Sequence, residues 1–180
     1  MAGAVTSPLY CPEPDKEYCV LKSTADVLIT SDFACNKKTL MFINGNLGID
    51  PPLKNSTDTD KLSSKNGCII VVKGYVIITD GLDASNNASF KYDKVNGYIL
   101  ADGQIIIGDE LEKRAPNTDP IIDGVYINGG LQSSKNDDKS ILFNRYLRLE
   151  DRLKFPLLAI DLHPKYGILG EKFFGSKYII

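Results

Sequence analysis

The fold is decided by a phrase of three apolar residues, one polar residue and a glycine, which occurs four times between Leu40 and Ser134. The four copies are Met41-Phe42-Ile43-Asn44-Gly45, Ile70-Val71-Val72-Lys73-Gly74, Ile99-Leu100-Ala101-Asp102-Gly103 and Val125-Tyr126-Ile127-Asn128-Gly129. Their glycines are 29, 29 and 26 residues apart. A fixed period between about 20 and 50 residues is typical of stacked supersecondary units rather than of one irregular core.

Aligned on these glycines, the copies alternate between apolar and other residues on both sides of a bend. The aligned apolar columns are Met41, Ile70, Ile99 and Val125, then Ile43, Val72, Ala101 and Ile127, then Leu47, Val76, Ile105 and Leu131. Such alternation predicts strands with one buried face. Glycine at the bend allows either a positive φ or a close backbone approach. We therefore expect a mainly β fold, a short parallel β-solenoid (β-helix) of about four to five coils with an interior of aliphatic ladders.

A second set of turn-forming pairs supports the same repeat. Asn66-Gly67, Asn96-Gly97 and Asp123-Gly124 precede the bend glycines by seven, six and five residues. Such pairs are strong turn formers, and here they are expected to open the first strand of each coil. They would also suit hairpins in an antiparallel sandwich or barrel. The near-equal offsets in three successive units favour the solenoid, because hairpins do not require them.

The chain of 180 residues is expected to form a single domain with three parts. Residues 1–35 form an amino-terminal arm and opening strand, residues 36–150 the coils, and residues 151–180 a carboxy-terminal cap. Ile141–Leu149 repeats the phrase with arginine in place of glycine, which indicates a last rung. A short helix is expected after His163-Pro164, since proline suits the first turn of a helix.

The polar segments between the apolar runs are expected to be loops that leave the coils on one face. They are residues 50–66, 83–93, 110–119 and 132–139. Insertions of this kind in solenoids often form the binding face.

Composition argues against several classes of partner. The formal net charge of −2 gives no electrostatic reason to bind nucleic acid or an anionic membrane. No run of about 20 apolar residues is present to span a bilayer. The first five residues lack the features of a signal peptide, as in a mature or truncated form of an exported protein.

The four cysteines are Cys11, Cys19, Cys35 and Cys68. An even number predicts two disulfides in an exported protein, with Cys11–Cys19 as the first expected pair and Cys35–Cys68 as the second. A zinc site lacks the CxxC pair or nearby histidine that would support it. Four unpaired buried thiols remain the other interpretation.

Several segments together carry a resemblance to a known type of protein. They are Asp123–Gly130, Asn144–Asp151, Pro-Lys-Tyr-Gly at 164–167 and Phe-Phe-Gly at 173–175. The pattern, over roughly residues 95–175, resembles the carboxy-terminal β-helical regions of large, uncharacterised exported proteins of candidate-phyla-radiation bacteria. Some of those resemble pilus-associated or polymer-forming surface proteins. The resemblance implies a place on the cell surface, and no catalytic residues come with it.

No catalytic, cofactor-binding or metal-ligating residues are predicted. Among the polar residues before the bend glycines only Asp102 is a carboxylate, and the sole histidine, His163, precedes a proline. The leading hypothesis is a non-catalytic structural or adhesive module outside the cell, whose partners are other surface subunits or a host or cell-surface ligand. The alternatives are a glycan-binding module that uses Tyr75, Tyr98 and Tyr126, or a polysaccharide-acting β-helix enzyme.

Two further expectations concern packing. The predicted core residues are Ile43, Val72, Ile99, Ile105, Ile127 and Leu147. The outward residues Phe42, Val71, Leu100 and Tyr126 are expected to form an apolar stripe, with Ile77 and Ile106 outward as well. Because water rarely contacts such a stripe in a monomer, we expect a cover. The candidates are Leu9-Tyr10, Val20-Leu21, Phe155–Ile160 or a neighbouring subunit.

Overall fold

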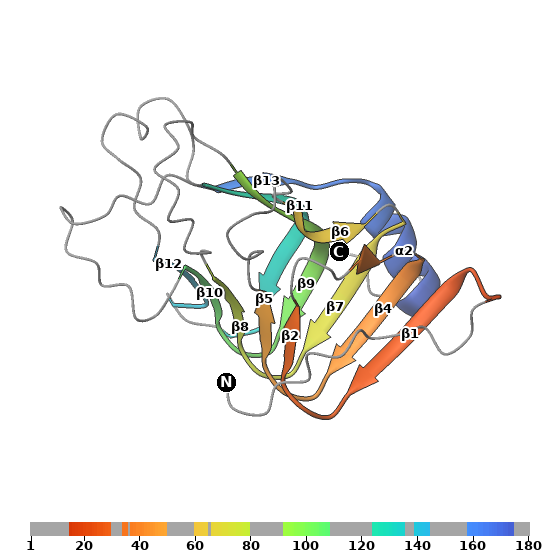
Figure 1. Ribbon diagram of the computed structural model, residues 1–180, viewed down its shortest axis with the longest axis horizontal. Coiled ribbons are helices and arrows are strands. Elements are labelled where there is room, and N and C mark those ends of the chain that lie inside the picture. Colours follow the sequence, from red (N-terminus) through yellow and green to blue (C-terminus); the bar gives the residue numbers. More distant parts are fainter. Residues whose placement is uncertain are drawn as a thin grey trace.

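The computed structural model of the chain is a parallel β-solenoid whose strands stack along one axis (Figure 1). It describes residues 15–29, 34–35, 37–49, 60–64, 66–79, 92–108, 124–135, 139–144 and 158–174. The strands are β1 (Tyr18–Ser23), β2 (Val27–Ile29), β3 (Ala34–Cys35), β4 (Lys38–Ile43), β5 (Leu47–Ile49), β6 (Asp60–Ser64), β7 (Cys68–Val72), β8 (Val76–Ile78), β9 (Tyr92–Ala101), β10 (Ile105–Ile107), β11 (Gly124–Ser133), β12 (Ile141–Phe143) and β13 (Leu158–Asp161). Helix α2 (Lys165–Phe174) follows them.

The strands form three stacks, which are named here in the order in which a coil visits them. The first stack holds β3, β6, the first half of β9, the first half of β11, and β13. The second holds β1, β4, β7 and the second halves of β9 and β11. The third holds β2, β5, β8, β10 and β12. All of these pairings are parallel, so each coil repeats the path of the coil before it.

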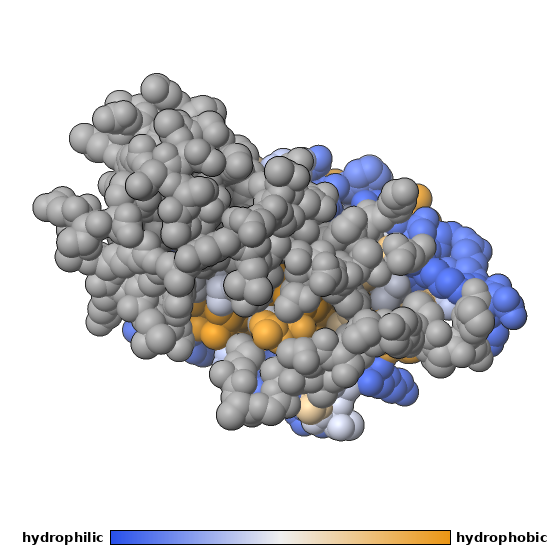
Figure 2. All heavy atoms as spheres, viewed as in Figure 1, coloured by the Kyte–Doolittle hydropathy of each residue, from blue (hydrophilic) through white to orange (hydrophobic). Residues whose placement is uncertain are grey.

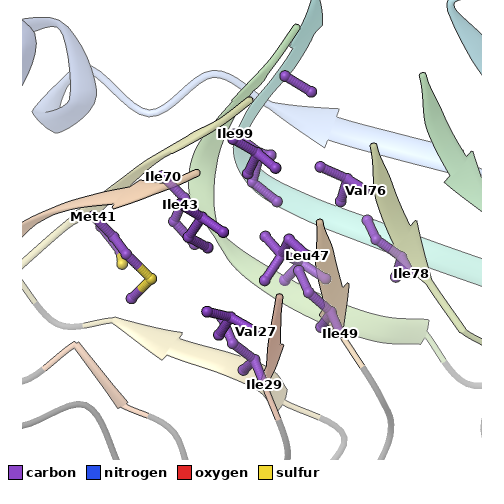
Figure 3. Packing of buried hydrophobic residues seen from close by; sticks show 14 of the residues in the cluster. Val27, Ile29, Met41, Ile43, Leu47, Ile49, Ile70, Val76, Ile78 and Ile99 are labelled. Carbon is purple, nitrogen blue, oxygen red and sulfur yellow. The ribbon is translucent and has the colours of Figure 1, made fainter. Parts of the chain in front are cut away.

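The core lies inside the three stacks and consists largely of ladders of aliphatic side chains; Figure 3 shows part of it. One ladder of the second stack runs through Leu21, Met41, Ile70, Ile99 and Leu131. A ladder of the third stack runs through Val27, Leu47, Val76, Ile105 and Ile141. These ladders form because every second residue of a strand points to the same side, and parallel register keeps equivalent residues adjacent.

The predicted fold class and most of the predicted core are confirmed. The residues Ile43, Val72, Ile99, Ile105 and Ile127 are at most 2% exposed and belong to one cluster. The sixth, Leu147, lies outside the described residues.

The predicted alignment of the fourth phrase is wrong. Gly129 pairs with Gly97 and not with Gly103, and Ile127 pairs with Val95. Val125–Asn128 therefore belongs to the first stack, whereas the other three phrases lie in the second. The spacing of 26 residues instead of 29 reflects this change of stack. Gly124, whose pair with Asp123 was expected to open a strand, is the first residue of β11.

The predicted last rung is also wrong. Ile141–Phe143 pairs with Ile105–Ile107, so β12 is the third-stack strand of the coil that contains β11. The last strand in the first stack is β13, which pairs with Val125–Asn128.

Two of the expected loops need correction as well. Asp60–Ser64, placed in the first of them, is strand β6. The segment 132–139 begins within β11 and lies between the second and third stacks, at a different corner from the others.

Candidate interaction surfaces

One corner of the solenoid anchors a set of connecting segments. Residues 50–59, 80–91, 109–123 and 145–157 lie outside the described residues, but the strands on both sides of each are described. Each segment follows a strand of the third stack and precedes a strand of the first stack. The departure points are stacked, since Thr79 donates its N–H to Ile49 O at 2.9 Å and Asn144 donates to Ile107 O at 2.8 Å. All four segments thus begin at one edge of the solenoid.

In the first four coils, the corner between the second and third stacks is closed by three-residue turns, at residues 24–26, 44–46, 73–75 and 102–104. Asp26 Oδ1 accepts hydrogen bonds from the backbone N–H of Asn46 at 2.8 Å and from its side-chain Nδ2 at 3.2 Å. Asn46 Oδ1 in turn accepts from the N–H of Tyr75 at 3.1 Å. Each of these polar side chains therefore satisfies a backbone group of the next coil. Only the last coil has a longer connection at this corner, residues 134–140 between β11 and β12.

A third corner, between the first and second stacks, carries stacked asparagines. Asn128 Nδ2 donates to Asn96 Oδ1 across 3.1 Å. The following residues, Gly97 and Gly129, also lie on top of one another, and a Cβ on Gly129 would overlap the carbonyl oxygen of Gly97. At Gly129 both this close packing of the backbones and a φ of +147° exclude a side chain.

Helix α2 lies over the outer side of the second stack. Tyr166 and Leu169 are buried in one cluster with Leu40 and Ile69. The outward residues Phe42, Val71, Tyr98 and Leu100 are partly buried against this cluster. Part of the apolar stripe that the sequence predicted is therefore covered by the chain itself, but by a helix that was not among the proposed covers.

The fourth residue of the predicted stripe, Tyr126, does not lie in it, because the Gly129 phrase belongs to the first stack. Tyr126 pairs with Lys94 and Ala159 in the first stack. The position next to Leu100 is held by Gln132, which is exposed.

The third stack also has an apolar outer column. Leu28, Gly48, Ile77, Ile106 and Leu142 are in register. Ile77 and Ile106 alternate with core residues and point outward, as predicted; Ile77 is half-buried and Ile106 is buried. Figure 2 shows apolar surface, in orange, on the face where Figure 1 places β5 and β8.

The three tyrosines considered for glycan contact lie at separate places. Tyr75 is exposed at the corner after β7. Tyr98 lies on the outer side of β9, with its ring centroid 6.3 Å from that of Tyr166 under helix α2. Tyr126 lies on the first stack, where its hydroxyl donates to Asp161 Oδ2 at 3.0 Å. The fold does not bring them together in one platform.

The pKa values of two side chains, Tyr126 and Lys165, differ from their ordinary values. The hydrogen bond to the Asp161 carboxylate raises the pKa of Tyr126 above its ordinary value, and burial and the Asp161 charge add to the effect. Desolvation lowers the pKa of Lys165. The Lys165 ammonium group lies 5.0 Å from the centre of the Tyr166 ring, within the range of a cation–π contact.

The cysteines act as a covalent link between coils. Cys35 and Cys68 form a disulfide with a Cα–Cα distance of 5.9 Å, and both residues are buried in the core. Cys19 is also disulfide-bonded. Its predicted partner, Cys11, lies outside the described residues.

The single histidine has a structural role at the start of α2. His163 Nδ1 accepts a hydrogen bond from the N–H of Lys165 at 3.1 Å, which satisfies one of the free donors of the first turn. Within the described ranges, no three His, Cys, Asp or Glu side chains come together as a metal site would require.

Because comparisons with known proteins gave no match, a function can be proposed only from the fold and its surfaces. The chain matches no family model, no curated protein and no solved structure. Of the helices in the described part of the chain, none is long and apolar enough to cross a membrane.

Proposed function

We propose that the protein is a non-catalytic structural or adhesive module that works outside the cell, as part of a surface or filament assembly. The observation that carries this proposal is the contrast between the corners of the solenoid. One corner anchors four stacked connecting segments, while the corner between the second and third stacks is closed in the first four coils by short turns, some of which bond coil to coil. Segments held by a rigid scaffold often carry functional residues, and the extended surfaces of solenoids are used for binding.

The disulfide supports the proposed location. Disulfides persist in oxidising compartments and are rare in reducing ones. Cys35–Cys68 joins β3 to β7 inside the core. Its separation of 33 residues in sequence makes it an effective constraint on the unfolded chain.

Labelling intact source cells with a reagent that does not cross membranes tests the location. The protein is expected to be labelled, with Cys35 and Cys68 joined when the peptides are mapped without reduction. Recovery from the cytosol with its thiols reduced would refute the proposal.

A second experiment tests the binding role of the connecting segments. Beads coated with the protein are compared with beads coated with a variant in which residues 80–91 are replaced by a short Gly-Ser turn. Retention of the beads on intact source cells should fall with the variant. Replacement of the turn at 134–140, which leaves a different corner, is the matched control. Equal retention of all three coatings would contradict a role for the anchored segments.

A further inference from the structure

The two ends of the solenoid differ in how well their ladders are covered. In the first coil the inward residues Leu21, Val27 and Ile29 are 6%, 2% and 1% exposed. In the last coil Ile141 and Ile160 are 39% and 47% exposed, although they continue the buried ladders of Ile105 and Ile127. The interior is therefore closed at the first end and open at the last.

The open end also has free strand edges. β13 and β12 are the last strands of their sheets, and among the described strands none pairs with their outer sides. Figure 1 shows β12 at the opposite end of the stack from β1. A strand edge presents backbone N–H and C=O groups that only another extended segment can pair in full.

We propose that this end is an interface with a second copy of the same chain, joined end to end about a two-fold axis. Stacking head to tail would require an open ladder at the first coil, where the core is already covered. The open ladder of the last coil instead matches the same end of another copy, which gives a closed dimer rather than a filament.

The register of such a contact follows from the strands. A two-fold axis perpendicular to the solenoid reverses strand direction, so β13 lies antiparallel to β12 of the second copy. Pairing that keeps inward residues together places Leu158 opposite Phe143 and Ile160 opposite Ile141, each pair forming twice. Leu158 and Phe143 are partly buried and already pack on the core, so the contact extends both ladders. Asp161, the last residue of β13, and Lys139, two residues before β12, bring opposite charges to the same edge.

Sedimentation equilibrium tests the contact, and it does not depend on what the connecting segments bind. The wild-type chain should be dimeric, and Ile160→Lys should raise the dimer dissociation constant at least about tenfold, because it places a charge in an apolar seam. Ile168→Lys is the matched control, since Ile168 is exposed on α2 and should leave the dimer unchanged. A monomeric wild-type chain, assemblies that grow beyond two copies, or an Ile160→Lys dimer as tight as wild type would overturn the proposal.

Cross-linking covers the case in which the lysine variant does not fold. A mixture of Ile160→Cys and Ile141→Cys chains should form a covalent heterodimer through the new cysteines under mild oxidation, since these positions face each other across the seam. A mixture of Ile168→Cys and Ile141→Cys chains should not. Equal yields from the two mixtures would overturn the register and the interface with it.

Discussion

The backbone N–H of Gly103 donates a hydrogen bond to the carbonyl oxygen of Gly74, 3.0 Å away in the preceding coil. Gly74 makes the same bond to Gly45 at 2.9 Å. A Cβ on Gly103 would lie 2.7 Å from that carbonyl oxygen, closer than such atoms approach. Positive φ values occur in the described glycines only at Gly67, Gly108 and Gly129. The repeated glycine is therefore required by the close approach of successive coils and not by an unusual backbone conformation.

Gly103→Ala should lower the free energy of unfolding by about 1–3 kcal/mol, the usual cost of forcing extra atoms into a packed site. Urea denaturation measures this. The control is Gly167→Ala, because Gly167 lies in α2 with no atom within 4 Å of an added Cβ. That change should stabilise the protein by about 0.5–1 kcal/mol through helix propensity. Equal effects of the two substitutions would show that close approach is not what selects the bend glycine.

Ile105→Ala should cost about 2–5 kcal/mol of unfolding free energy, the range found for deleting buried aliphatic groups. Ile105 is fully buried between Val76 and Ile141 in the third stack. Leu162→Ala, at a position 71% exposed, should change stability by less than about 0.5 kcal/mol. A loss for Ile105→Ala as small as that of the control would contradict the register of the third stack.

The repeat could be predicted from the sequence because its signal is local and periodic. Alternation around Gly45, Gly74 and Gly103 fixes which residues face the core, and the structure agrees with it in these three copies. The phrase at Gly129 looks the same over five residues but lies at another corner. The pairing of Gly129 with Gly97 identifies its corner, and pairing between distant strands leaves no mark within one copy, although the shorter spacing of 26 residues is a sign of the change.

The segment that covers the apolar stripe was not predicted from the sequence, for a different reason. Helix α2 contains Gly167 and Gly170, which weaken any helical pattern in the sequence. Among residues 165–170, the buried ones are Tyr166 and Leu169, spaced three residues apart, and Gly170. Tertiary packing on Leu40 and Ile69 stabilises this helix more than its own propensity does. The helix itself was predicted, but the surface it covers could be learned only from the fold.

Leu169→Ala should loosen α2 from the second stack, because Leu169 packs in one cluster with Leu40 and Ile69. We expect a loss of about 2–3 kcal/mol in unfolding free energy and faster amide hydrogen exchange along β4 and β7. Ile168→Ala, on the exposed side of the same helix, is the matched control. Unchanged exchange in β4 and β7 after Leu169→Ala would show that the helix does not protect this face.

Removing the Cys35–Cys68 disulfide should lower stability by about 3–4 kcal/mol, the loop-entropy value for a separation of 33 residues. The double variant Cys35→Ser/Cys68→Ser measures this without a reducing agent. Peptide mapping of the wild-type protein should recover the linked pair. Finding Cys35 or Cys68 free in oxidatively purified protein would contradict the assignment, and Cys11–Cys19 stays a prediction that the same map tests.

The Tyr126–Asp161 hydrogen bond should make stability fall at alkaline pH. The bond raises the pKa of Tyr126 in the folded state, so its contribution is fully present below the unfolded value of about 10 and is lost as pH rises through the folded value. The difference in unfolding free energy between wild type and Tyr126→Phe should therefore be constant near neutral pH and shrink at alkaline pH. Asp161→Asn keeps an acceptor but removes the charge, so the pKa of Tyr126 should move back toward its ordinary value. A stability difference that does not change with pH would mean that the bond between β11 and β13 contributes nothing in solution.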